Sequence, residues 1–369
     1  MRIVAHVWRS CTQGRPRNVF ARSLSHVVII ADDLTGACDT GLAFSKQGLR
    51  TRVYLPPFQG AESGQSAPSV LAFSAESRNG SKEEAASRHR HAVETAVEHV
   101  SSSGFALLYK KVDSQLRGNP AVEVSAVLTT STLAWAVVAP ALPSAGRTTV
   151  GGYCLQYGVP VNRLSKDHIA SCHNAHIPTL LQEEGFCTTH ISLGDIAHGV
   201  DHVASLMSEA ALSEGSAALP DVDAALAGKC VVCDACSEDD LMTVAMAANK
   251  AMHVTGFAPV LVGSAGLASA VPVAFGMSTK DSHHAPQATA SDATTHAPVL
   301  VVSGTSQPLT LQQLEYLHRE ERVVNTCSEN LTASSVVLTH HSEDSDAAAR
   351  AAADAARVLL PTSRTATKP

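Results

Sequence analysis

The stretch His26-Val-Val-Ile-Ile-Ala31, followed at once by Asp32-Asp33-Leu34-Thr35-Gly36, indicates the fold class of this chain. A short and almost continuous apolar run is typical of a central strand in a parallel sheet, which is buried on both faces. Residues 36–47 then read as a helix, and Gly48 suits its C-terminal cap. A strand, a polar loop and a helix in this order predict an α/β unit.

The same alternation continues outward from this unit. Strands are predicted at 51–55, 70–73, 105–112, 134–139, 190–193, 230–234, 259–262, 298–302 and 335–339, and helices at 81–100, from 121, and at 179–184, 200–212, 239–254, 310–321 and 344–359. This order predicts an α/β fold of two domains with mainly parallel sheets, the second of them incomplete. We expect an N-terminal extension (1–25), an α/β domain (26–275), a linker (276–297) and a partial second domain (298–369).

Composition narrows the class of protein. The 369 residues are 45% hydrophobic and 17% charged, which suits a globular chain of two domains. A net charge of -7 implies neither nucleic acid nor an anionic membrane as partner. No apolar run reaches the roughly 18 residues of a membrane span, and we expect a cytoplasmic protein. The Arg-rich, acid-free residues 1–25 fit either a transit peptide or a disordered or misassigned extension.

Nine cysteines without a secretory signal indicate free thiols in a reducing compartment. Cys230 and Cys233 have the spacing of metal ligands but fall on a predicted strand. Residues three apart on a strand point to opposite faces, so no metal site is expected.

Four loops at predicted strand ends carry polar residues that the fold itself does not require. In the first, one acid of the Asp32-Asp33 pair suffices to cap the helix, which leaves the other free to bind hydroxyls or act as a base. Arg78 in the second loop could hold a carboxylate with two hydrogen bonds. In the third, 110–120, Lys110 and Lys111 point to opposite faces. Arg147 in the fourth loop, 139–152, is a further candidate anion contact.

The chain resembles the four-carbon acid sugar kinase family, which includes 3-oxo-tetronate, threonate and erythronate kinases. The segments that carry the resemblance occur in the family's order: ADDLTGACD, ESR, KKVDSQLRGN, APALPSAGRTTVGGY, VCDACSEDDL and VGSAGLA. The resemblance implies an N-terminal domain that binds the sugar acid and a C-terminal domain that binds ATP, with Mg²⁺ on the phosphates.

Carried over to this sequence, the resemblance implies a sugar-acid site built from carboxylate, cationic and hydroxyl side chains. Asp32 or Asp33 would orient or deprotonate the attacking hydroxyl, and Arg78 or Arg117 would hold the substrate carboxylate. The sugar-acid site would be lined by Asp32, Asp33, Ser77, Arg78, Lys111, Asp113, Ser114, Arg117 and Asn119, with Arg147 as the further anion contact. Gln115 stands where the family usually has Thr, and Cys38 where it often has Asn.

Ser303, Gly304 and Ser306 resemble the family's first nucleotide loop. The later glycine loops of the family have no counterpart, because no glycine follows Gly304. The nucleotide domain is therefore expected to be incomplete. A degenerate kinase, a complementing C-terminal fragment and a shortened reading frame all fit this expectation.

Two functions follow from these observations. The first is an ATP-dependent kinase for a four-carbon sugar acid, working alone, as a homo-oligomer or with a complementing fragment. The alternative is an inactive relative that binds the acid without phosphoryl transfer. A Rossmann dehydrogenase is disfavoured, because the first strand is followed by ADDLTG and not by G-x-G-x-x-G.

Overall fold

The computed structural model describes residues 26–58, 69–100, 106–164, 172–213 and 228–277, and then 299–303, 312, 323–325 and 335–339. Contacts divide the chain into two compact units, residues 1–285 and 286–369. The predicted extension 1–25, the helix 344–359, and the helix 310–321 except residue 312 lie outside the described residues.

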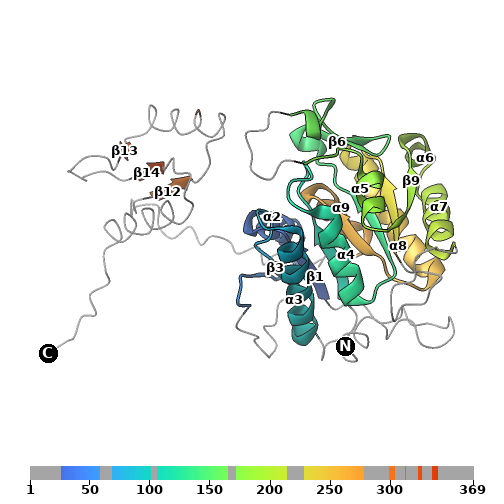
Figure 1. Ribbon diagram of the computed structural model, residues 1–369, viewed down its shortest axis with the longest axis horizontal. Helices are drawn as coiled ribbons and strands as arrows, with labels where there is room; N and C mark the ends of the chain where they lie inside the picture. The colour runs from blue at the N-terminus through green and yellow to red at the C-terminus, as the bar shows by residue number, and fades with distance from the viewer. Residues whose placement is uncertain are drawn as a thin grey trace. The chain divides into compact units, whose positions relative to one another are not determined.

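The first unit is built on a sheet of eight parallel strands (Figure 1). In spatial order they are β2 (Thr51–Tyr54), β3 (Val70–Ser74), β1 (His26–Ala31), β4 (Ala106–Lys111), β11 (Val260–Gly263), β5 (Trp135–Ala139), β10 (Lys229–Cys233) and β9 (Cys187–Ile191). The sequence-based prediction of a mainly parallel α/β fold is confirmed.

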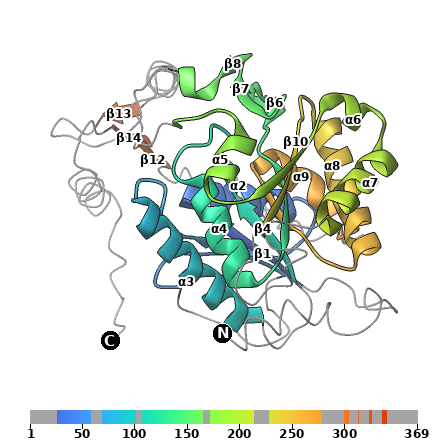
Figure 2. The ribbon, with the colours of Figure 1, turned by 45° about the vertical axis from the view of Figure 1, so that its right-hand side comes forward.

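Helices cover both faces of this sheet (Figure 2). One face carries α2 (Leu34–Ser45), α7 (Val200–Leu212), α8 (Glu238–Thr255) and α9 (Ala265–Ala274), with the short α6 (Leu193–Ala197) beside α7 and α8. The other face carries α3 (Lys82–Val100), α4 (Pro120–Ser131) and α5 (Ile177–Glu183). Alternate residues of β1 enter the two cores, Ile29 the first and Ile30 the second, which is why the strand is apolar throughout.

A small antiparallel sheet was not predicted from the sequence. It follows β5 and the 3-10 turn η2 (Pro143–Ala145), and it comprises β6 (Arg147–Val150), β7 (Tyr153–Gln156) and β8 (Val159–Pro160), with the 3-10 turn η3 (Val161–Arg163) after it. Asp234, which follows β10, accepts from the amides of Gly151 and Gly152 at 2.7 and 2.9 Å. Its carboxylate therefore holds the β6–β7 turn in place.

The second unit contains a parallel sheet of three described strands, in the order β12 (Val299–Ser303), β14 (Ser335–Thr339) and β13 (Val323–Asn325). Strands at β12 and β14 were predicted, and β13 was not.

Candidate functional site

The candidate site lies at the carboxyl edge of the large sheet, at β1 and β4. Strands β2 and β3 lie on one side of β1, whereas β4 and the later strands lie on the other. Open α/β sheets bind ligands at such a switch point, because the loops that leave the two strands diverge there. The loops after β1, β3 and β4 hold most of the residues predicted to bind a sugar acid.

The two acids after β1 have different surroundings. Asp33 is the N-cap of α2, and its Oδ1 accepts from the amide of Gly36 at 2.7 Å. Its side chain is 22% exposed, whereas that of Asp32 is 1% exposed. Burial and the neighbouring charge of Asp32 raise the pKa of Asp33. Asp33 is therefore the carboxylate of this pair that solvent reaches.

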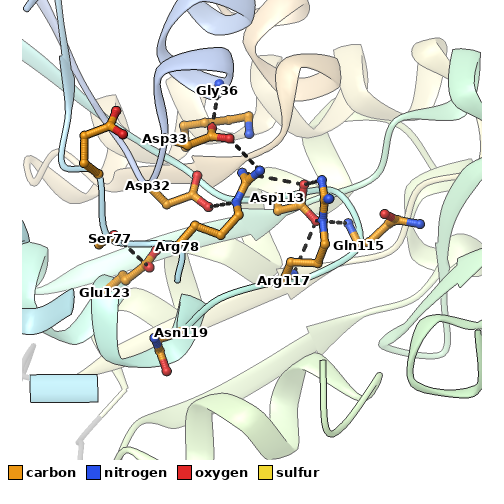
Figure 3. Close-up of polar contacts among 12 residues, drawn as sticks. Asp32, Asp33, Gly36, Ser77, Arg78, Asp113, Gln115, Arg117, Asn119 and Glu123 are labelled. Carbon is orange, nitrogen blue, oxygen red and sulfur yellow. Dashed lines mark hydrogen bonds and ion pairs between the residues drawn. The ribbon is translucent and has the colours of Figure 1, made fainter. Parts of the chain in front are cut away.

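Arg78, from the loop after β3, binds both acids (Figure 3). Its Nε donates to Oδ2 of Asp32 at 2.7 Å, and its Nη1 lies 2.6 Å from Oδ2 of Asp33. Its Nη2 is 3.7 Å from Oδ1 of Asp113. All three guanidinium nitrogens thus face carboxylates of the protein itself.

These ion pairs decide the charge state of the buried acid. Burial pushes the pKa of Asp32 upward, but Lys110, Arg78 and Lys111 outweigh it and hold the pKa below its ordinary value. Oδ1 of Asp32 is buried and has no hydrogen-bond partner among the described residues. Asp32 is therefore an ionised anchor for Arg78.

The turn after β4 is organised by Asp113 and Arg117. Arg117 donates from Nε and Nη2 to the two oxygens of Asp113, at 2.8 and 2.7 Å. The backbone amides of Gln115 and Arg117 also donate to Oδ2 of Asp113, at 3.0 and 3.3 Å. Burial opposes ionisation of Asp113, but Arg117, Arg78 and Lys111 hold its pKa well below the usual range.

Lys110 and Lys111 point to opposite faces of β4, as predicted. Lys110 pairs with Glu123 of α4 at 2.9 Å. Lys111 lies against the first turn of α2, where a Cβ on Gly36 would come within 3.0 Å of its Nζ. Burial lowers the pKa of Lys111, against the pull of Asp32 and Asp113. Lys111 is thus the lysine on the α2 side of β4, near the cap residue Asp33.

The small antiparallel sheet contacts the site at the turn after β4. Nη1 of Arg147, on β6, donates to Oγ of Ser114 at 2.7 Å, and its Nε is buried without a hydrogen-bond partner among the described residues. On β7, opposite Arg147, Gln156 accepts a hydrogen bond from the side chain of Gln115. Two side-chain contacts therefore tie this sheet to the turn at 113–117.

Two predicted site residues, Ser77 and Asn119, make their side-chain hydrogen bonds to other groups of the protein. Ser77 is buried, and its Oγ lies 3.3 Å from Oε1 of Glu123. Asn119 donates from Nδ2 to the carbonyl of Gly80 at 3.0 Å. Among the predicted nucleotide residues, Ser303 ends β12, whereas Gly304 and Ser306 lie outside the described residues.

Several residues around the site were missed by sequence reasoning. Gln156 and Glu123 lie in regular elements and carry no loop signal. Asp234 lies in the VCDACSEDDL segment that supported the family resemblance, and there it holds the β6–β7 turn and contacts Nε2 of His190 at 3.0 Å. Its place directly after a buried strand is the signal that could have identified it.

Cys230 and Cys233 lie on opposite faces of β10, as expected for residues three apart on a strand. Cys233 belongs to the core under α7, α8 and α9, and Cys230 to the core under α3, α4 and α5. The described part of the chain contains no group of three or more His, Cys, Asp or Glu side chains placed to hold a metal ion. Within the same residues, no helix combines the length and the apolar character that crossing a membrane requires.

Comparisons with known proteins identify the family of this chain. A family model described as "Sugar-binding N-terminal domain" matches residues 27–271. The D-threonate kinase of Salmonella typhimurium is 34% identical over 294 residues, 78% of this chain and 60% of that protein. The D-erythronate kinase of Heliobacterium modesticaldum is 31% identical over 228 residues, 60% of this chain and 48% of that protein. The chain therefore spans about half to three fifths of the length of these curated relatives.

Solved structures share the fold. A Bordetella bronchiseptica protein, crystallised with bound citrate as a domain-swapped dimer, is 27% identical to this chain. The similarity covers 92% of this chain and 80% of that protein, with a TM-score of 0.53.

Proposed function

The chain belongs to the four-carbon acid sugar kinase family and carries its sugar-binding N-terminal domain, and from this we propose that it binds a four-carbon sugar acid and transfers the γ-phosphoryl group of ATP to it. D-Threonate and D-erythronate, named for the two relatives above, are the first substrates to consider. They differ at one stereocentre and present the same carboxylate and hydroxyl groups.

The observation that carries the proposal is the balance of charge at the switch point. Three carboxylates, Asp32, Asp33 and Asp113, lie there among the cations Arg78, Arg117 and Lys111, and a fourth cation, Arg147, reaches the same turn through the Ser114 hydroxyl. Cations exceed carboxylates by one, so a monoanionic ligand would complete the balance. The Bordetella relative was crystallised with citrate, which is also a hydroxy acid but carries three carboxylates.

The carboxylate of the substrate is assigned to Arg147 together with Arg117. Arg78 is already surrounded by Asp32, Asp33 and Asp113. By contrast, Arg147 contacts only the Ser114 hydroxyl by a side-chain hydrogen bond within the described residues, and its Nε is unpartnered there. Arg117 is 30% exposed and binds Asp113 through only two of its three nitrogens. Both arginines reach the turn at 113–117, where they could bind one carboxylate together.

Asp33 is assigned as the acceptor of the hydrogen of the attacking hydroxyl. It is the exposed member of the acid pair, and its raised pKa makes it a better base than Asp32. Asp32 stays buried and holds Arg78, which in turn orients Asp33. Besides accepting the proton, these residues position the hydroxyl for its attack on the γ-phosphoryl group.

ATP would supply the phosphoryl group, and Mg²⁺ would neutralise charge on its phosphates. Mg²⁺ commonly keeps several waters and binds through phosphates and one or two carboxylates. This suits the described residues, where no metal-binding cluster occurs and the buried carboxylates are paired with arginines. No protein ligand of Mg²⁺ is therefore assigned.

The purified chain tests this proposal directly. ADP release is measured with ATP and Mg²⁺ in the presence of D-threonate, D-erythronate or 3-oxo-tetronate, and thermal shifts are recorded with each ligand alone. We expect turnover with one of the three acids. If an acid stabilises the protein while ATP neither stabilises it nor supports turnover, the chain is a sugar-acid-binding relative without phosphoryl transfer. No stabilisation by any of the acids would contradict both functions.

A further inference from the structure

A buried charged cluster lies below the site on the α3–α4 side of the sheet. It consists of Glu123 on α4, Lys110 on β4 and His89 on α3, whose side chains are at most 2% exposed, together with the buried Ser77. Glu123 is its centre: Oε2 binds Nζ of Lys110 at 2.9 Å, and Oε1 accepts from Oγ of Ser77 at 3.3 Å. Figure 3 shows Glu123 reaching Ser77 beneath Asp32 and Arg78.

His89 is a neutral member of this cluster. Its Nδ1 donates to the carbonyl of Ala85 at 2.9 Å, so its Nε2 carries the lone pair and faces Oε2 of Glu123 at 3.7 Å without a hydrogen-bond partner. Burial and the charge of Lys110 lower the pKa of His89 to about 4. Glu123 and Lys110 therefore form a one-to-one ion pair in the interior.

A buried ion pair is a poor device for stability alone, because the cost of desolvation offsets much of the attraction. This pair instead connects two parts of the site. Nζ of Lys110 also donates to the carbonyl of Lys111 at 2.5 Å. On the other side, Ser77 donates its backbone amide to the carbonyl of Asp32 at 2.8 Å. Glu123 is thus one side chain away from both Lys111 and the loop that carries Arg78.

The loop that carries Arg78 needs such an anchor. Glu76, just before Ser77, has a φ of 50°, a left-handed conformation that a residue with a Cβ adopts only when its surroundings hold it there. The side chain of Ser74 and the guanidinium of Arg88 both bind Glu76, and Asn119 binds the carbonyl of Gly80. The contact with Glu123 holds this loop from below, at Ser77.

We propose that Glu123 is a positioning residue for the sugar-acid site. Through Ser77 it holds the loop that carries Arg78, and through Lys110 it holds the end of β4 at Lys111. In this way Glu123 keeps both cations in position next to the acids after β1. The proposal rests on the proposed function for its ligand. It does not place Glu123 in contact with substrate, because α4 and Lys110 lie on the opposite face of β4 from Lys111.

Three variants, each measured by Tm and by sugar-acid Kd, distinguish a positioning role of Glu123 from a role in core stability alone. Glu123→Gln keeps the shape and removes the charge that Lys110 requires, so it lowers both Tm and sugar-acid affinity. The double change Lys110→Met with Glu123→Met replaces the pair by apolar side chains, which is often neutral or stabilising, and Tm returns towards that of the wild type. Its sugar-acid Kd nevertheless stays about tenfold weaker, because Ser77 and Lys111 have lost their anchor. Asp201→Asn, in an exposed ion pair on α7, is the matched control and changes neither quantity.

Removal of the Ser77 hydroxyl tests the contact between Glu123 and the loop that carries Arg78. Ser77→Ala weakens the sugar-acid Kd several-fold in the wild type, and it adds nothing in the Glu123→Gln protein if the two side chains act as one unit. Recovery of affinity together with Tm in the double Met variant would overturn the proposal, and so would additive effects of Ser77→Ala and Glu123→Gln.

A readout without ligand separates this proposal from the proposed function. The carboxyl group of Asp32, followed by carbon-13 NMR, titrates at higher pH in the Ser77→Ala protein, which keeps every charge of the site, because the loop no longer holds Arg78 against Asp32. An upward shift supports the arrangement even if no sugar acid binds. An unchanged Asp32 titration contradicts it even if sugar acids do bind.

Discussion

Arg117 binds Asp113 through two nearly parallel hydrogen bonds, from Nε to Oδ2 at 2.8 Å and from Nη2 to Oδ1 at 2.7 Å. The same carboxylate accepts from two backbone amides of its own turn. Asp113 therefore fixes the path of the turn, and Arg117 supplies the charge that keeps Asp113 ionised. The third guanidinium nitrogen of Arg117, Nη1, takes no part in this pair.

Arg117→Lys tests whether the shape of the guanidinium matters. Lysine keeps the charge but cannot make two parallel bonds to one carboxylate. We expect the free energy of unfolding to fall by about 1–2 kcal/mol and the sugar-acid Kd to weaken about tenfold. Denaturant unfolding and calorimetric titration measure the two effects. Arg90→Lys, on the exposed side of α3, is the control, and equal effects of both changes would contradict the role of Arg117.

Asp33→Asn tests the proposed base without losing the helix cap. Asparagine is as good an N-cap as aspartate, so Tm should fall only by the contribution of the ion pair between Arg78 and Asp33. An amide cannot take a proton, and we expect kcat to fall about 10²–10⁴-fold while the sugar-acid Kd changes much less. In the wild type, kcat should fall as the pH drops through the raised pKa of Asp33. Asp39→Asn, exposed on the same helix, is the control; a variant at Asp33 with normal kcat would exclude it as the base.

Gly36→Ala tests the close approach of Lys111 to α2. A Cβ at this position would lie 2.8 Å from Oδ1 of Asp33 and 3.0 Å from Nζ of Lys111, so one of the two must move. We expect a loss of about 1–3 kcal/mol in unfolding free energy and weaker sugar-acid binding. Gly194→Ala is a matched control in the first turn of α6, where the nearest atom is 3.5 Å away. Similar losses from both changes would contradict this explanation.

The strands and helices around the site follow largely from local sequence, because central strands must be apolar on both faces. The run from His26 to Ala31 is one example, and the prediction of β1 there is confirmed. The sheet at β6–β8 could not be predicted in this way. Its turn depends on Asp234, more than 80 residues away, whose carboxylate binds the amides of Gly151 and Gly152.

The polar residues of the site could be located at strand ends, but their pairing could not. Whether Arg78 faces a substrate or three aspartates depends on the distance between the loops after β1, β3 and β4. Glu123 left a weak signal. It lies three and four residues before Ala126 and Val127, which are both buried, and an acid on such a helix face needs a partner.

Arg147→Gln tests the assignment of the carboxylate contact. The site has four cations and three carboxylates, and Arg147 is the cation without a carboxylate partner among the described residues. Its loss should therefore weaken the sugar-acid Kd about 10–100-fold. Titrations at rising salt should also show a smaller loss of affinity in the variant than in the wild type. Arg163→Gln, exposed on η3, is the control. An unchanged Kd in the Arg147 variant would show that Arg147 does not bind the substrate carboxylate, which would leave Arg117 as its only proposed contact.

His89→Gln tests the neutral state of the buried histidine through the pH dependence of stability. The pKa of His89 is lowered from 6.5 to about 4, so between these values the unfolded chain binds a proton that the native protein does not. Stability is therefore full above pH 6.5, falls as the pH drops towards about 4, and loses up to about 3 kcal/mol from this residue. The lowered pKa values of Asp32 and Asp113 act in a separate window, below 3.8.

We expect His89→Gln to flatten the unfolding free energy between pH 6.5 and 4, measured by urea titration at half-unit steps, and to leave the fall below pH 3.8 in place. His173→Gln is the control, because that side chain is 66% exposed. Its curve should run parallel to that of the wild type throughout. If the His89 variant also gives a parallel curve, the histidine is not held neutral and the ion pair of Glu123 and Lys110 is not the one-to-one pair described above.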